Sequence, residues 1–115
     1  MRKMLPPEAV TALESPPSKS QFAGEFAHMI YENAFVELWA RPGLTPKDRS
    51  ILTLGILIAQ GSQDELKAHV AIALKNGVTR EELGEILYHA MGYAGIPAAA
   101  AALTVARKVV DGPPK

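Results

Sequence analysis

Apolar residues recur at three- and four-residue steps along most of the chain, the periodicity of an α-helix with one buried face. The first run starts at Ser20 and continues to about Trp39, where the segment 41–43 (Arg-Pro-Gly) interrupts it. Its apolar positions are Phe22, Phe26, Met29, Ile30 and Ala34. We therefore expect a first helix over residues 20–39.

The next two helices are delimited by their end signals. Thr45 is suited to be an N-cap and Pro46 to be the first helical residue, and the apolar run that follows stops at Gly61. A third helix is expected to open at 62–65 with acidic residues in its first turn, where the helix dipole favours them. Asn76 and Gly77 are typical of a left-handed helix end.

The remaining sequence predicts two more helices and completes the fold class. Thr79 and Glu82 have the spacing of a capping box, so a fourth helix is expected from there to about residue 94. Residues 95–97 (Gly-Ile-Pro) end it and start a fifth, which runs to about 110 and contains five consecutive alanines suited to close helix packing. Five helices and no alternating pattern predict an all-α protein. We expect an extended arm over 1–19, which is rich in proline, and one helical domain over 20–115.

Composition narrows the functional classes. Hydrophobic residues make up 48% of the 115 residues and charged residues 21%, so part of the apolar surface is expected to be covered by self-association. Lys and Arg (12) balance Asp and Glu (12), which argues against a nucleic-acid or membrane partner. The absence of cysteine excludes thiol peroxidase chemistry. We found no signal-peptide pattern or membrane span, so the cytoplasm is the expected compartment.

Two sets of polar side chains are candidates for chemistry. Arg49, Thr53 and Gln60 form a polar stripe on the otherwise apolar second helix, either as part of a site or as a solvated edge. Glu65 and His69 lie one helical turn apart, so each can set the protonation of the other, as general acid–base work requires. An exposed pair or a core histidine would look the same. No complete set of metal ligands accompanies them, and we expect no metal.

Two further groups of residues could belong either to a functional site or to ordinary structure. One side of the fourth helix carries Glu85, His89 and Tyr93. These residues form either a second polar wall of a pocket or a solvent-exposed side of the helix. Trp39 and Arg41 lie at the end of the first helix, where an arginine behind an aromatic ring is suited to hold an anion.

Several segments together resemble the γ-carboxymuconolactone decarboxylase family. They are 39–44 (Trp-Ala-Arg-Pro-Gly-Leu), 48–54 (Asp-Arg-Ser-Ile-Leu-Thr-Leu), 64–69 (Asp-Glu-Leu-Lys-Ala-His), 76–82 (Asn-Gly-Val-Thr-Arg-Glu-Glu) and 93–97 (Tyr-Ala-Gly-Ile-Pro). The resemblance runs from about Phe22 to Val110, and motifs in this order are more specific than any one alone. Alkyl hydroperoxidase D-like relatives carry two cysteines where this chain has Ser62 and Glu65, while His69 matches their histidine.

The resemblance implies an all-α alkyl hydroperoxidase D-like fold of five to six helices, assembled as trimers or hexamers. It also implies a cofactor-free carbon–carbon lyase of aromatic catabolism (the β-ketoadipate pathway) that removes carbon dioxide from γ-carboxymuconolactone or a related carboxylated butenolide. Such a reaction passes through a dienolate-like intermediate, and the protein must hold an anion and return a proton.

On this basis we expect three catalytic residues and six substrate-binding residues. His69 is the expected proton donor, Glu65 its partner and Arg49 an anion ligand. The substrate-binding residues are Trp39, Arg41, Thr53, Glu85, His89 and Tyr93. The alternatives are a cofactor-free isomerase or other proton-transfer enzyme on a related lactone or enone, and a non-catalytic oligomer that binds a small ligand.

Overall fold

The computed structural model describes residues 22–26 and 29–112, and every described regular element is a helix. The expected arm over 1–19 lies outside these residues. The chain divides into two compact units, residues 1–45 and 46–115, which are treated separately below. The all-α prediction is confirmed, whereas the single domain over 20–115 stays a prediction.

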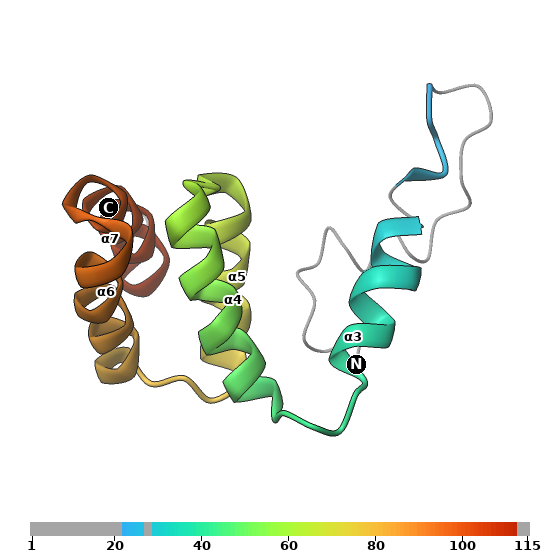
Figure 1. Ribbon diagram of the computed structural model, residues 1–115, viewed down its shortest axis with the longest axis horizontal. Coiled ribbons are helices and arrows are strands. Elements are labelled where there is room, and N and C mark those ends of the chain that lie inside the picture. The colour runs from blue at the N-terminus through green and yellow to red at the C-terminus, as the bar shows by residue number, and fades with distance from the viewer. Residues whose placement is uncertain (1–21, 27–28, 113–115) are drawn as a thin grey trace. The chain divides into compact units, whose positions relative to one another are not determined.

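The first unit differs from the expected α-helix over 20–39. Residues 22–25 form a turn, in which Ala23 has a φ of +52°, a value that a regular helix does not allow. A π-helix, η2 (Met29–Val36), follows and continues into the short α3 (Glu37–Trp39) (Figure 1). Apolar spacing of three and four residues marks a buried face, but it does not distinguish α from π hydrogen bonding. The predicted interruption after Trp39 is confirmed, since the next helix begins at Pro46.

The second unit consists of four α-helices in two hairpins, α4 (Pro46–Gln60) with α5 (Gln63–Lys75), and α6 (Arg80–Ala94) with α7 (Ile96–Asp111) (Figure 1). Helix α4 packs against the other three, and α7 also packs against α5 and α6. The buried core is apolar and draws on all four helices. It comprises Leu54, Ile58, Leu66, Val70, Ala73, Val78, Leu83, Ala102 and Ala106. On α7 the buried positions are all alanines, which confirms that the alanine run serves close packing.

The ends of these helices confirm most of the signals that predicted them. Helix α5 is followed by Gly77 with a φ of +98°, a conformation that L side chains rarely adopt. At the start of α6 both bonds of the capping box are present. The Glu82 N–H donates to Thr79 Oγ1 at 3.0 Å, and the Thr79 N–H donates to Glu82 Oε1 at 2.9 Å. Local sequence therefore fixes where the helices of this unit begin and end.

Candidate active site

The most buried titratable side chain described is His69, on the inner face of α5. Its side chain is 7% exposed, while that of Glu65, one turn earlier, is 62% exposed. Glu65 Oε2 lies 4.0 Å from His69 Nε2, at the outer limit of an ion pair. Burial lowers the pKa of His69 below its ordinary value of 6.5, and the charge of Glu65 opposes this shift. The resting imidazole is therefore largely neutral at neutral pH, and additional negative charge nearby would favour its protonation.

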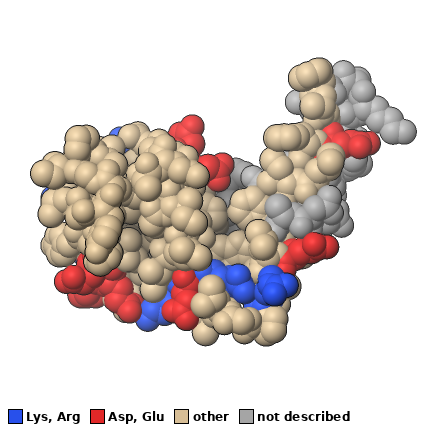
Figure 2. Space-filling view, in the orientation of Figure 1, with Lys and Arg blue, Asp and Glu red and all other residues tan. Residues whose placement is uncertain are grey.

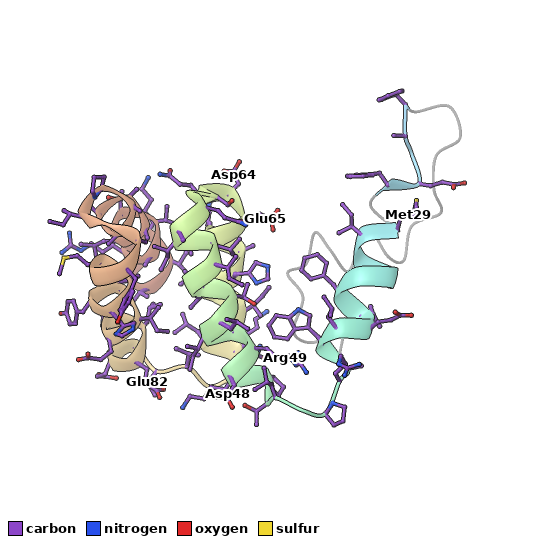
Figure 3. The ribbon with its side chains drawn as sticks, viewed as in Figure 1. Met29, Asp48, Arg49, Asp64, Glu65 and Glu82 are labelled. Carbon is purple, nitrogen blue, oxygen red and sulfur yellow. The ribbon has the colours of Figure 1, made fainter. Side chains whose placement is uncertain are left out.

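Arg49 and Thr53 lie one turn apart on α4. The Thr53 hydroxyl donates to the Arg49 backbone carbonyl oxygen at 2.8 Å, so its proton is already used inside the helix. Both residues are half-buried. Figure 3 shows Arg49 and Glu65 on the side of the α4–α5 hairpin that faces away from α6. The three residues expected to be catalytic thus belong to one helical hairpin. Gln60, the last residue of the predicted stripe, is exposed at the end of α4.

A separate groove of about 570 Å³ lies between α4 and α6. Small and aliphatic side chains make up most of its lining, and polar groups come only from α6. The lining residues are Ile51, Gly55, Ala59, Glu82, Glu85, Ile86, His89, Ala90, Tyr93 and Ala94. The rings of His89 and Tyr93 lie 5.1 Å apart with 32° between their planes. Glu85, His89 and Tyr93 are all exposed, so the predicted polar wall exists but faces an open groove.

Glu82, at the lower end of this groove, is committed to structure. Its Oε2 forms an ion pair with Lys47 Nζ at 2.9 Å, which ties the start of α6 to the start of α4. The hydrogen bond from the Thr79 backbone N–H and the contact with Lys47 hold the pKa of Glu82 below its ordinary value. Figure 3 places Glu82 beside the first turn of α6.

The structure therefore divides the predicted residues of the second unit into two groups. Arg49, Thr53, Glu65 and His69 do not line the groove that Glu85, His89 and Tyr93 line. The helical repeat of about 100° per residue explains the separation. On α4, positions 51, 55 and 59 face α6, while 49 and 53 lie on the opposite side.

Trp39 and Arg41 belong to the first unit. Trp39 ends α3 and is half-buried, and Arg41 follows in the exposed turn. Their contribution to substrate binding stays a prediction.

Sequence reasoning missed one buried polar contact. Ser50 is only 1% exposed, and its Oγ accepts a hydrogen bond of 2.9 Å from Asn76 Nδ2. A serine on the buried side of an apolar helix is a signal that a partner must exist. However, the 26 residues between the two positions hide which residue that partner is.

Two features are absent from the described residues. No group of three or more His, Cys, Asp or Glu side chains there is arranged to hold a metal ion. Among the same residues, no helix is long and apolar enough to cross a membrane.

Comparison with known proteins gives a consistent result. The family model described as the carboxymuconolactone decarboxylase family matches residues 24–108. The chain is 41% identical over 90 residues to 4-carboxymuconolactone decarboxylase of Acinetobacter baylyi, covering 78% of this chain and 67% of the relative. It is 42% identical over 83 residues to nitrosuccinic acid decarboxylase of Metarhizium robertsii, covering 72% and 58%.

A third relative is an uncharacterized 15.0 kDa protein of Paracoccus denitrificans, 34% identical over 82 residues and covering 70% of this chain and 61% of the relative. The chain thus spans between 58% and 67% of the length of these relatives. The match of the family model to most of the folded part, together with the similarity to two decarboxylases, confirms the resemblance. The chain belongs to the carboxymuconolactone decarboxylase family.

Proposed function

We propose that this protein is a decarboxylase, a carbon–carbon lyase that acts on a small carboxylated compound without a cofactor. The observation that carries the proposal is the similarity to two relatives that are both named decarboxylases, at 41% and 42% identity. The buried histidine beside a carboxylate on α5 supplies a group that can handle the proton of such a reaction.

The chemistry of the relatives' named substrates supports a reaction without a cofactor. Loss of carbon dioxide leaves an electron pair on carbon, which must be delocalised. In γ-carboxymuconolactone the ring carries this pair onto the lactone oxygen, and in nitrosuccinic acid the nitro group accepts it. Because the electron sink lies within the substrate in both cases, the protein needs only to bind an anion, stabilise developing charge and deliver a proton.

We assign to His69 the role of the acid that donates a proton to the substrate carbon. An anionic substrate beside His69 adds to the negative charge of Glu65, and together they favour the imidazolium that burial alone disfavours. When the carbon–carbon bond breaks and carbon dioxide leaves, the substrate carbon takes the proton from His69. The neutral imidazole then regains a proton from solvent, so each turnover consumes one proton and needs no electron donor.

We propose that Arg49 binds the substrate carboxylate, and we keep Trp39 and Arg41 as further candidates for substrate binding. It lies on the same helical hairpin as Glu65 and His69, and a guanidinium binds a carboxylate through two hydrogen bonds. Glu85, His89 and Tyr93, which we expected to bind substrate, line the separate groove between α4 and α6, so the site that we propose around His69 does not include them. γ-Carboxymuconolactone or a related carboxylated butenolide is the substrate that we propose first.

The test is the release of carbon dioxide from γ-carboxymuconolactone and from nitrosuccinic acid by the purified protein. We expect turnover of at least one of them, and a loss of at least about 100-fold in kcat/KM in His69→Ala. Arg107→Ala is the control and should retain activity within a few-fold, because Arg107 is exposed on α7 and belongs neither to the proposed site nor to the groove. Glu65→Gln should shift the pH profile to lower pH, because the carboxylate that supports protonation of His69 is gone.

The results of these assays distinguish between the proposed function and its alternatives. Unchanged activity in His69→Ala would remove the role assigned to that residue. Tight binding of either acid without turnover would replace the decarboxylase proposal with a ligand-binding protein. Rearrangement of a lactone or enone without release of carbon dioxide would indicate an isomerase.

We also propose that the protein functions as a homo-oligomer, with a trimer or a hexamer as the expected assembly. The second unit exposes several large apolar side chains that a soluble monomer would rarely keep in contact with water. Those at least 40% exposed are Leu52, Ile56, Tyr88, Met91, Tyr93 and Ile96. Native mass spectrometry at micromolar concentration measures the assembly directly, and a monomer would contradict this proposal.

A further inference from the structure

An apolar ridge lies directly beside the groove between α4 and α6. Its two side chains, Leu52 and Ile56, are 56% and 47% exposed and stand one turn apart on α4. Each follows a groove-lining residue, Ile51 or Gly55, so the ridge lies about 100° around the helix from the groove wall. The same helix thus presents an apolar projection and an apolar hollow next to each other.

The surroundings of this face are poor in charge. In Figure 2 a broad surface over the second unit carries no Lys, Arg, Asp or Glu, and charged side chains border it along its lower margin, with acidic side chains also at its upper edge. None of the residues that line the groove is Lys or Arg. Its carboxylates are Glu82, which Lys47 neutralises, and Glu85. An anionic carboxylate substrate is therefore poorly suited to this groove, whereas an apolar surface fits it.

We propose that a second copy of this chain occupies the groove, in a two-fold contact that inserts the Leu52–Ile56 ridge of each copy into the groove of the other. The inference rests on the proposed self-association, names the face that makes it, and requires an assembly with two-fold axes, which a hexamer can have and a trimer cannot. A two-fold interface uses the same patch on both copies, so the patch must be self-complementary. The apolar ridge and the apolar groove lie side by side and both run along α4, so together they meet that condition.

The register of the contact follows from the helices themselves. Helices α4 and α6 run in the same direction, and the Lys47–Glu82 ion pair places their first turns at the same level (Figure 1). Ile56 is about 13 Å along α4 from Lys47, and Ala90 is about 12 Å along α6 from Glu82, at 1.5 Å per residue. The proposed two-fold axis runs parallel to α4, between the ridge and the groove. Rotation about it does not change the height of any residue along the helix direction. Ile56 of one copy therefore faces Ala90 of its partner, and Leu52 faces Ile86.

The small residues of the groove explain why it can accept the ridge. Gly55, Ala59, Ala90 and Ala94 leave the hollow open, and a Cβ added at Gly55 would meet nothing within 4 Å apart from its chain neighbours and the backbone of its own helix. Insertion of Leu52 and Ile56 would fill this space and remove two half-exposed aliphatic side chains from water. The rings of His89 and Tyr93 would then border the contact at its polar edge.

Cysteine cross-linking tests this contact cleanly, because the natural chain contains no cysteine. The variants Ile56→Cys and Ala90→Cys are mixed, allowed to exchange subunits and oxidised under mild conditions. We expect a disulfide-linked dimer between the two variants. The control mixture replaces Ala90→Cys by Thr104→Cys, an exposed position on α7 outside the groove, and should give little cross-linking. Absence of the Ile56–Ala90 link in an assembly of native mass would overturn the proposed face.

Two further measurements define the contact. The double variant Ile56→Cys/Ala90→Cys should give dimers joined at two positions, because a two-fold contact closes on itself, whereas a ladder of longer species would refute the two-fold arrangement. Ile56→Glu should weaken association by at least about 100-fold, since a carboxylate would enter an apolar groove, while the control Thr104→Glu, at an exposed position of α7 outside the groove, should leave it intact. Helicity by circular dichroism checks that each variant is folded. Because none of these readouts depends on catalysis, failure of the decarboxylase proposal would leave them interpretable.

Discussion

Replacing Asn76 by alanine tests the buried hydrogen bond between the end of α5 and the start of α4. Asn76 donates to Ser50 Oγ at 2.9 Å, and Ser50 is 1% exposed. In Asn76→Ala the serine hydroxyl loses this bond and is too deeply buried for water to replace it, which costs about 2 kcal/mol of unfolding free energy. The backbone of Asn76, with φ −84° and ψ 5°, is open to alanine, so no strain adds to this figure.

The complementary change, Ser50→Ala, should cost less. It removes the buried hydroxyl together with its need for a partner, and the half-buried Asn76 amide can turn toward solvent. We expect a loss below about 1 kcal/mol for Ser50→Ala, and a coupling energy of about 1 kcal/mol from the double-mutant cycle.

Urea unfolding followed by circular dichroism at 222 nm measures both changes at one fixed protein concentration, because self-association affects apparent stability. With an m-value of about 2 kcal/mol/M, Asn76→Ala should lower the midpoint by about 1 M. Lys75→Ala, an exposed neighbour in the last turn of α5, is the control and should shift the midpoint little. Equal losses in Asn76→Ala and Ser50→Ala, with no coupling between them, would refute the reasoning.

Three further predictions concern single positions of the second unit. Thr79→Ala should cost about 1 kcal/mol, because the Glu82 N–H loses its cap, and an unchanged urea midpoint would contradict the capping box. Leu54→Ala should cost about 2–5 kcal/mol, because this 1% exposed side chain lies in the core, and a loss below 1 kcal/mol in the same assay would argue against its burial. Burial lowers the pKa of His69, so between that lowered value and 6.5 the unfolded chain binds more protons, and stability must fall as the pH drops through this range. In His69→Gln the slope of unfolding free energy against pH between pH 5 and 7 should flatten, and an unaltered slope would show that His69 does not cause it.

The sequence by itself determined the helices of the second unit. Pro46, Gly77 and the Thr79–Glu82 capping box act through their own backbone preferences and hydrogen bonds within a few residues, so their effect can be read without the fold. It was less informative for the first unit, where an α-helix was expected and a π-helix is found over Met29–Val36. The spacing of apolar residues indicates which face is buried. It does not indicate whether each backbone N–H bonds to the carbonyl oxygen four residues earlier, as in an α-helix, or five residues earlier, as in a π-helix.

Only the tertiary structure decided which candidate residues share a site. The periodicity placed Arg49 and Thr53 on one face of α4, and Glu85, His89 and Tyr93 on one face of α6, but the rotation of each helix against its neighbours is set by core packing. That packing turns the α6 residues toward an open groove and leaves Arg49 with Glu65 on another side. It also buries His69 while Glu65 stays in solvent, which lowers the pKa of the imidazole. Sequence names the groups that can do chemistry, whereas long-range packing determines their partners and their protonation.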